Sequence, residues 1–464
     1  MSNKHFWALI CGPLLAAAFA TSMNISGWHV EACWTTAIVL LCVIWWIFEP
    51  IPIPATSLIP ITFFPLTGVL SKEEVAKAFG SDLILLMLGG FMISVAMAQS
   101  GTHRRLALGL VNLIGGNSSK RIVFGFMCAC AVLSMWISNT ATALMMLPLA
   151  LAIIDQSQDK KIALPLLLAI AYGCSIGGVG TPIGTPPNLI FMQEYQNFTG
   201  LSVSFSQWMM WGLPVVFLMV PLASLWLTRN LDYVGKLTMP QVGSWRPEEQ
   251  RVLIVFGITV LAWITRLEPF GGWSTWLGLK GATDATVALI AVIAMFLIPN
   301  GRGEKLLNWE TAVKIPWGIL LLFAAGITIA QAFVESGLSK FIAEQLAILS
   351  DLHPLLIIVS IALVVTFLTE ATSNAATAIL LMPILAPAAL AAGLDPALLM
   401  VPAAMSASCA FMLPVATPPN AIVFGTGKIP IAYMAREGLV LNFIGIFVIT
   451  TVCYFLVTLA HITM

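Results

Sequence analysis

Charged residues are scarce in this sequence. Only 9% of its 464 residues are Asp, Glu, Lys or Arg, and 59% are hydrophobic, whereas soluble domains carry about 25% charged residues. Too few charged side chains are present to cover the surface of a water-soluble protein of this length, which excludes that class. The formal net charge is zero, so nothing indicates a nucleic acid or another highly charged macromolecule as a partner.

Clusters of metal-binding side chains are also missing from the sequence. The eight cysteines lie in or beside apolar segments, and the closest two, Cys128 and Cys130, do not have the spacing of a zinc site. We interpret them as small apolar residues. The five histidines are scattered and no HExxH motif occurs. The sequence therefore does not predict an enzyme, and the lack of a run resembling a selectivity filter argues against a channel.

Apolar runs recur along the whole chain. A membrane-spanning helix needs about 20 predominantly apolar residues. The first run follows Lys4 and contains Ala18-Phe-Ala20, which are features of a signal peptide, but a first spanning helix is the favoured interpretation. We therefore predict an all-α polytopic protein of the cell (inner or plasma) membrane. Example runs are 6–21, 83–97, 162–190, 208–227, 252–264, 287–298 and 440–459.

The distribution of Lys and Arg predicts how the chain crosses the membrane. Cytoplasmic loops are enriched in these residues. With 11 spanning helices, 16 of the 21 Lys and Arg fall on one side and 5 on the other, which places the N-terminus in the cytoplasm and the C-terminus outside. This count requires the stretches 122–152 and 354–391 to enter the membrane and return on the same side. Both carry polar residues and proline, as expected of re-entrant hairpins buried in protein.

The two halves of the chain repeat the same motifs in the same order. Ser138-Asn-Thr-Ala-Thr142 matches Ser373-Asn-Ala-Ala-Thr377 at an offset of 235 residues. Gly184-Thr-Pro-Pro-Asn188 matches Ala416-Thr-Pro-Pro-Asn420 at an offset of 232 residues. Under the predicted topology the halves have opposite orientations. Inverted repeats with interrupted apolar segments at matching positions are the best sequence indication of a transporter's central binding site.

The Ser-Asn turns are suited to binding an anion. Ser, Asn and Thr are poor residues inside a helix but good caps at its start. The half-helix that follows such a turn presents free N–H groups and about half a positive charge. In the first turn Asn139 adds an amide donor and Thr140 a hydroxyl. Together these groups predict a carboxylate site without any basic side chain.

The Thr-Pro-Pro turns are suited to binding a hard cation. Two prolines remove N–H donors and break a helix, and the freed carbonyl oxygens are ligands for sodium. No Lys or Arg is expected in the membrane core, so a buried dianion would need bound cations to neutralise it. This favours symport with a cation. For each motif alone an ordinary structural role is the alternative, because Pro, Gly, Ser and Thr are common in membrane helices.

One acidic residue, Glu370, precedes the second Ser-Asn turn. An ionisable residue inside the membrane is a functional candidate by default. Two interpretations are open for Glu370. Either its carboxyl group carries a proton or tunes a cation site, or it only forms hydrogen bonds within the hairpin.

With these motifs the chain resembles the divalent-anion:sodium symporter family, which includes sodium-coupled dicarboxylate and citrate carriers. The resemblance rests on residues 138–140, 184–188, 373–374 and 416–424 and covers nearly the whole chain. It implies 11 spans plus two re-entrant hairpins, a scaffold domain that forms a homodimer, and a transport domain that moves past it like an elevator. The implied segments are 1–120 (scaffold helices 1–4), 121–228 (transport domain, with hairpin 122–152, broken helix 162–192 and helix 207–228), 229–353 (scaffold helices 7–9) and 354–464 (transport domain, with hairpin 354–391, broken helix 396–424 and helix 437–460).

The resemblance also implies the binding residues. Many members carry Thr where this chain has Ala375, and the missing hydroxyl removes one hydrogen bond to the substrate and leaves the preferred anion undecided. Sodium ions would occupy two or more sites, of which one would use Ser134, Ser138, Asn139 and Gly184 and another Thr369, Thr372, Asn374 and Ala416. Substrate would contact Asn139, Thr140, Thr185, Pro186, Asn374, Ala375, Thr417 and Pro418.

Two functions are compatible with this resemblance. The first is sodium-coupled symport of C4 dicarboxylates such as succinate, malate or fumarate into the cytoplasm. The second is sodium-independent exchange of dicarboxylates, 2-oxoglutarate or citrate. The lack of a basic residue in the predicted core favours the first.

Overall fold

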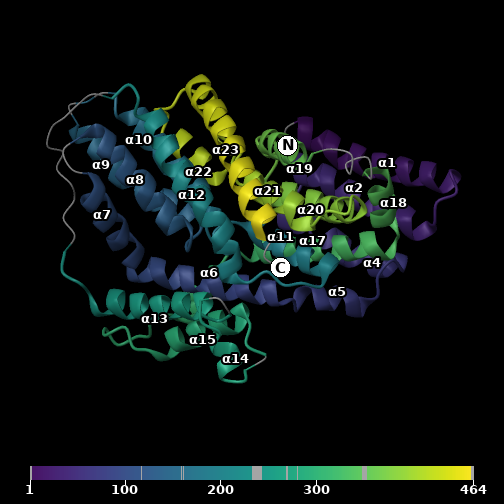
Figure 1. Cartoon of the computed structure of the whole chain (residues 1–464), viewed down its shortest axis with the longest axis horizontal. Helices are drawn as coiled ribbons and strands as arrows, with labels where there is room; N and C mark the ends of the chain where they lie inside the picture. Colours follow the sequence, from purple (N-terminus) through teal and green to yellow (C-terminus); the bar gives the residue numbers. More distant parts are fainter. Residues whose placement is uncertain are drawn as a thin grey trace.

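The computed structural model describes residues 3–115, 118–157, 159, 161–231, 243–267, 270–279, 281–346 and 353–460. Within these ranges the regular elements are all helices (Figure 1), apart from one isolated bridge between Pro299 and Lys305. Eight of the described helices are long and apolar enough to cross a bilayer, and five shorter apolar helices accompany them. The chain is therefore a multi-pass helical membrane protein, as predicted. The number of 11 spans stays a prediction.

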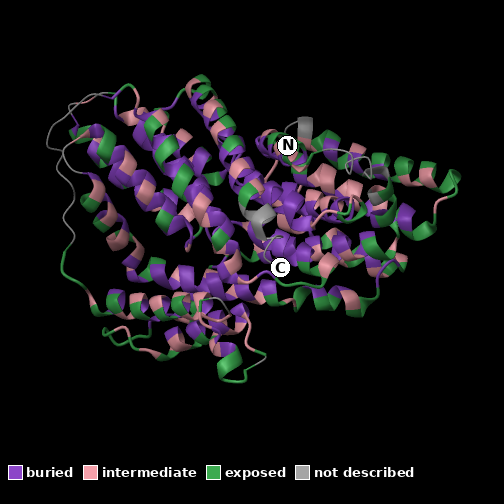
Figure 2. Cartoon of the chain, viewed as in Figure 1, coloured by how far each residue is buried: buried purple, intermediate pink, exposed green. Residues whose placement is uncertain are grey.

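The N-terminal helices form one end of the molecule (Figure 1). Helix α1 is apolar on all sides and mostly exposed (Figure 2), as a helix in contact with lipid is expected to be. The indole of Trp45 donates a hydrogen bond of 3.1 Å to the carbonyl of Ala8 and ties α2 to α1. The first six helices are α1 (Asn3–Ile25), α2 (Val30–Phe48), α3 (Ile53–Thr56), α4 (Leu58–Thr67), α5 (Lys72–Phe79) and α6 (Asp82–Ser100).

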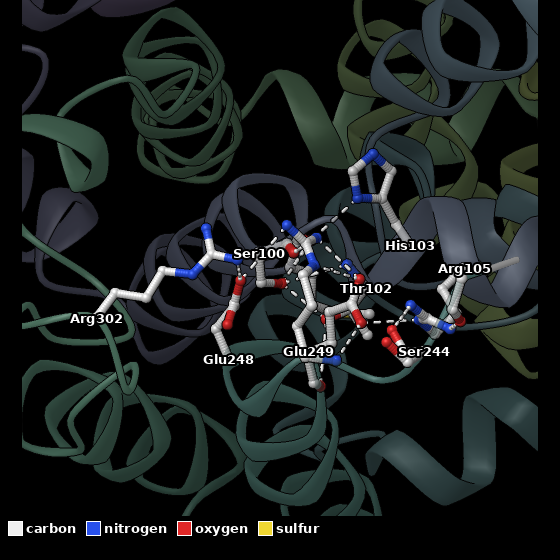
Figure 3. A network of polar contacts seen from close by, with 11 residues as sticks. Ser100, Thr102, His103, Arg105, Ser244, Glu248, Glu249 and Arg302 are labelled. Atoms are coloured by element: carbon white, nitrogen blue, oxygen red, sulfur yellow. Dashed lines mark hydrogen bonds and ion pairs between the residues drawn. The ribbon is translucent and has the colours of Figure 1, made fainter.

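Helix α7 (Thr102–Gly115) leads from α6 to the first hairpin, and a polar network fixes its start (Figure 3). The carboxylate of Glu249, at the beginning of α13 (Pro247–Ile264), accepts hydrogen bonds of 2.8 Å from Arg105 Nε and from Arg246 Nη2. Arg246 Nη2 also donates to the carbonyl of Ser100 at 2.7 Å. These contacts hold the junction of α6 and α7 against α13.

The first hairpin and the first broken helix lie where the sequence predicts them. Ser138 caps α9 by accepting a hydrogen bond from the N–H of Ala141, and Pro186 occupies the first position of α11, where its missing N–H costs nothing. The final helix of this half packs behind them. The helices are α8 (Ser119–Ser134), α9 (Asn139–Gln156), α10 (Ala163–Gly178), α11 (Pro186–Thr199) and α12 (Phe205–Leu227).

The middle of the chain returns to the periphery of the molecule, where α13 and α15 pack along α6 (Figure 1). Asp284, at the start of α15, receives Arg266 Nε at 2.6 Å and the N–H of Phe205 at 3.1 Å. The second contact joins α15 to the start of α12. Besides α13, these helices are α14 (Trp273–Trp276), α15 (Asp284–Leu297), α16 (Trp309–Ala312), α17 (Trp317–Glu335) and α18 (Leu338–Leu346).

The second hairpin and broken helix repeat the first. The last helix begins at Ile431, earlier than the predicted 437, because the charges in its first turns are paired: Glu437 is buried and contacts Arg229 Nη1 at 2.8 Å. The pairing lets a charged segment continue into a helix that the hydrophobic pattern alone does not mark. The helices are α19 (Pro354–Thr369), α20 (Asn374–Ala391), α21 (Pro396–Ala407), α22 (Pro418–Phe424) and α23 (Ile431–Ala460).

The two halves interlock at the centre of the molecule. Helix α11 packs against α20 and α21 of the second half, while α22 packs against α9 and α10 of the first. Each broken helix thus sends its second part to the hairpin of the other half. Buried residues concentrate here (Figure 2), and every residue of α10 and α21 is buried. This exchange brings all four motif segments to one place.

Candidate functional site

One cavity, of about 380 Å³, is lined by all four motif segments. Its volume is within the range of about 300–1,000 Å³ that is usual for small-molecule sites. The polar wall consists of the tips of both hairpins and the turns of both broken helices, and the opposite wall is apolar and comes from α3, α6 and α17. No charged side chain belongs to this lining among the described residues. The polar wall contains Ser138, Asn139, Thr140, Gly184, Thr185, Pro186, Ser373, Asn374, Ala375, Ala416, Thr417 and Pro418, and the apolar wall Ile53, Pro54, Met87, Phe91, Ile319 and Leu322.

Two larger cavities, of about 600 and 430 Å³, lie elsewhere. Both involve α1 and α2, and their walls are almost entirely apolar side chains. They lack the hydrogen-bonding groups that a small polar solute requires. The cavity between the repeats is therefore the candidate functional site.

The hairpin tips direct helix N-termini at the cavity. In each tip a serine hydroxyl accepts from the third N–H of the following helix at 3.2 Å, Ser138 from Ala141 and Ser373 from Ala376. The serine carbonyls accept from Thr142 and Thr377. Since the first N–H groups of a helix have no partner within it, those of residues 139, 140, 374 and 375 are left as donors. Two positive helix ends therefore meet at the cavity.

Behind each tip lies a cluster of oxygen atoms. The hydroxyl of Ser134 contacts both Asn139 Oδ1 and the carbonyl of Cys174, the latter at 2.7 Å. In the second half the hydroxyl of Thr369 contacts Asn374 Oδ1 at 3.0 Å and the carbonyl of Ala407 at 2.9 Å. A hydroxyl has one proton, so it cannot satisfy two acceptors at once. Each cluster therefore has an excess of oxygen lone pairs, which is the environment that a hard cation prefers.

The broken-helix turns are braced by the last residue of each Thr-Pro-Pro-Asn motif. Asn188 Nδ2 donates to the carbonyls of Gly178 and Thr181 at 3.0 and 2.7 Å. Asn420 Nδ2 donates to the carbonyls of Ala410 and Leu413 at 3.1 and 3.0 Å. Both side chains are fully buried. The sequence shows these asparagines as part of a duplicated motif, but their bracing role was not predicted.

Glu370 is buried beside the second cluster and is occupied by four donors. Its Oε1 accepts from the N–H groups of Phe411 and Met412 at 2.7 and 2.9 Å and from Asn442 Nδ2 at 2.9 Å. Its Oε2 accepts from the N–H of Leu413 at 3.0 Å. The carboxylate therefore binds the turn of the second broken helix rather than its own hairpin. Asn442 was not predicted, since nothing near it in the sequence indicates a partner 72 residues away.

The structure brings most of the predicted site residues together. All eight residues expected to contact substrate line the cavity, as do Ser138, Gly184 and Ala416 of the expected sodium sites. Ser134 and Thr369 lie behind the two asparagines and are fully buried. Thr372 differs, because its hydroxyl is turned to the carbonyl of Leu368 at 3.0 Å and to Thr377 Oγ1 at 2.6 Å. The roles of these residues stay predictions.

Comparisons with known proteins agree with this picture. Residues 43–401 match the family model described as "Citrate transporter". The chain is 41% identical over 474 residues to the sodium-dependent dicarboxylate transporter SdcS of Staphylococcus saprophyticus, covering 97% of this chain and 91% of that protein. It is also 41% identical over 472 residues to SdcS of Staphylococcus aureus strain RF122, with 96% and 90% covered.

A solved structure supports the fold. The YdaH transporter of Alcanivorax borkumensis superimposes with a TM-score of 0.60 at 15% identity, covering 86% of this chain and 88% of that one. The family model spans well over half of the sequence, and the two curated relatives match nearly all of it. The chain therefore belongs to the citrate transporter family and is a member of the divalent-anion:sodium symporters that its motifs resemble.

Proposed function

We propose that this protein carries C4 dicarboxylates such as succinate, malate or fumarate into the cytoplasm by symport with sodium ions. The observation that carries the proposal is one cavity bordered by two helix N-termini and two oxygen clusters, without a charged side chain among its described lining residues. The relatives SdcS are named as sodium-dependent dicarboxylate transporters, which supports both the cargo and the coupling ion.

The chemistry of the site explains why the two solutes would travel together. A dianion in a buried site is costly unless opposite charge lies close to it. Helix N-termini supply partial charges only, so sodium ions in the clusters behind Asn139 and Asn374 would supply the rest. Each asparagine lines the cavity and contacts its cluster. Anion and cation would then stabilise each other through a shared side chain.

We further propose an elevator mechanism in a homodimer, with the hairpins and broken helices moving past the other helices. The packing of equivalent residues supports this. A Cβ atom built on Gly90 of α6 would lie 3.7 Å from Cβ of Ile183, whereas Val415, the counterpart of Ile183, is 82% exposed. Conversely, a Cβ on Gly326, the counterpart of Gly90, would lie 3.0 Å from Cγ1 of Ile379. The counterpart of Ile379 is Leu144, which is 55% exposed.

Exchanging the conformations of the two halves would bring Val415 to Gly326 in the opposite state. We expect a Val415→Cys/Gly326→Cys pair, in a background without the native cysteines, to form a disulfide that stops transport reversibly. The pair Gly90→Cys/Ile183→Cys is the matched control, because its Cβ separation of 3.7 Å already permits a disulfide. A crosslink in the control pair alone, under all sodium and substrate conditions, would contradict the exchange. High-yield crosslinks between protomers through residues near 138 or 373 would contradict the proposed dimer.

Uptake of labelled succinate into proteoliposomes tests the function. An inward sodium gradient is expected to drive accumulation, and its removal should abolish it. The competing function, sodium-independent exchange, predicts uptake without sodium that depends on dicarboxylate, 2-oxoglutarate or citrate loaded inside the vesicles. Absence of uptake under both conditions, with correctly inserted protein, would refute both.

Substitution of Ala375 by Thr should change the preference among anions. Ala375 lines the cavity at the position where the first repeat offers Thr140. The new hydroxyl adds a donor beside a carboxylate, and a hydrogen bond to a charged group contributes roughly 1.5–3 kcal/mol before desolvation. Thr is also larger, so bulkier citrate should suffer more than succinate.

The measurement for Ala375→Thr is the ratio of half-saturating concentrations for succinate and citrate, with the sodium dependence as internal control. The ratio is expected to shift towards succinate while the sodium dependence stays constant. An unchanged ratio with an altered sodium dependence would place Ala375 on the cation side of the site.

A further inference from the structure

The first oxygen cluster has a gap at Gly178. A Cβ atom built on this residue would lie 3.1 Å from the carbonyl oxygen of Gly184, 3.2 Å from Asn139 Oδ1 and 3.3 Å from Asn139 Nδ2. A position that is close to all three atoms lies inside the group of oxygen atoms that surrounds the proposed cation. The missing side chain of Gly178 therefore leaves this space open.

Ordinary reasons for a glycine do not apply to Gly178. Its φ is not in the positive range that favours glycine. No backbone atom blocks a side chain there outright, since the nearest is at 3.1 Å. Two neighbours differ: a Cβ on Gly177 would lie 2.2 Å from the carbonyl oxygen of Ala131, and one on Gly184 would lie 2.4 Å from that of Gly178. Those glycines are required by close packing of the backbone, and Gly178 is not.

The second half carries a methyl group at the same place. The offset of 232 residues that relates Asn188 to Asn420 also relates Gly178 to Ala410. The structural equivalence is direct, because the carbonyl of each residue accepts the Nδ2 hydrogen bond of its bracing asparagine, at 3.0 and 3.1 Å. Ala410 is fully buried. The two clusters thus share the same oxygen groups but differ by one methyl group at this position.

We propose that Gly178 and Ala410 set the size of the two cation sites, so that the first is the wider and the second the narrower. The inference rests on the proposed sodium-coupled function and adds a pair of residues that determine ion specificity. A methyl group at 178 would occupy space within the ligand group, weakening sodium binding and favouring the smaller lithium ion. Removal of the methyl group at 410 would have the opposite effect on the second site.

Two reciprocal variants, Gly178→Ala and Ala410→Gly, test the proposal. The readouts are the cation dependence of succinate uptake in proteoliposomes and, without substrate, the rise in melting temperature that sodium or lithium causes, since an ion that binds the folded state stabilises it. Gly178→Ala should raise the half-saturating sodium concentration by about tenfold, as loss of one interaction with a charged group does, and shift the lithium-to-sodium ratio towards lithium. Ala410→Gly should shift the ratio towards sodium.

Gly180→Ala is the matched control, because its Cβ would meet the Cε atom of Met135, the far end of that side chain, at 2.9 Å and not the cluster. Its ratio is expected to equal that of the wild type. If both reciprocal variants leave the ratio unchanged, the proposal is refuted. Should Gly178→Ala fail to fold, Ala410→Gly alone decides, since it only removes a methyl group. A wild-type protein that neither sodium nor lithium stabilises or drives would instead refute the proposed function.

Discussion

Asn139→Ala is expected to abolish sodium-driven uptake in a protein that still inserts and folds. The side chain of Asn139 lines the cavity, and its Oδ1 contacts the hydroxyl of Ser134 in the first oxygen cluster. Alanine removes an amide donor from the anion and an oxygen ligand from the cation at once. Because each interaction with a charged group contributes roughly 1.5–3 kcal/mol, the two losses together should lower uptake at least about a hundredfold.

Asn374→Ala should have the same effect, since Asn374 Oδ1 contacts Thr369 Oγ1 in the second cluster at 3.0 Å. The loss should appear in both ligands, because coupling between two binding sites is reciprocal. Uptake and the stabilisation by sodium with and without succinate are the measurements. Asn197→Ala serves as control, because this amide bonds Gln193 and Glu194 on α11, outside the cavity lining. Wild-type uptake in a properly inserted Asn139→Ala protein would contradict the assigned role.

The positions of the hairpin tips and broken helices could be predicted because their signals are local. Ser138 and Ser373 each precede a helix that they cap, and Pro186 and Pro418 each occupy the first position of a helix. A cap or a proline acts on residues within one helical turn, so the sequence alone is sufficient. The duplication of these signals also indicated that the tips share one site.

Features that depend on distant residues could not be predicted. The hydroxyl of Thr372 faces Thr377 and its own helix, although its position in the motif suggested a cation ligand. A threonine side chain has a local backbone acceptor available in any helix, so the motif does not determine its orientation. Likewise, the partners of Glu370 lie 41 to 72 residues further along the chain, and only the fold brings them together.

Glu370→Gln is expected to lower transport by about ten- to a hundredfold and to reduce thermal stability. The four donors on the Glu370 carboxylate hold the turn at 411–413 from which Ala416 reaches the cavity. A glutamine side chain has one oxygen, so its NH₂ group would face the N–H of Leu413 or those of Phe411 and Met412. Leaving a buried polar group without a partner costs about 1–3 kcal/mol, which displaces the turn and the cation ligands it carries.

The first half makes the equivalent tie with the opposite chemistry. There Thr181, in the turn, donates its hydroxyl proton to the carbonyl of Met135, the counterpart of Glu370. Thr181→Val removes this single neutral hydrogen bond and is the matched control, with a smaller loss of transport than Glu370→Gln because one bond is lost and no donor is forced against another. Comparing sodium-driven uptake in the two variants across external pH separates an anchor from a proton carrier. If Glu370→Gln transports at the wild-type rate and has lost only its pH dependence, Glu370 carries a proton and the anchoring role is wrong. If uptake falls at every pH together with the melting temperature, the carboxylate acts by holding the second broken helix in the shape that its cation site requires.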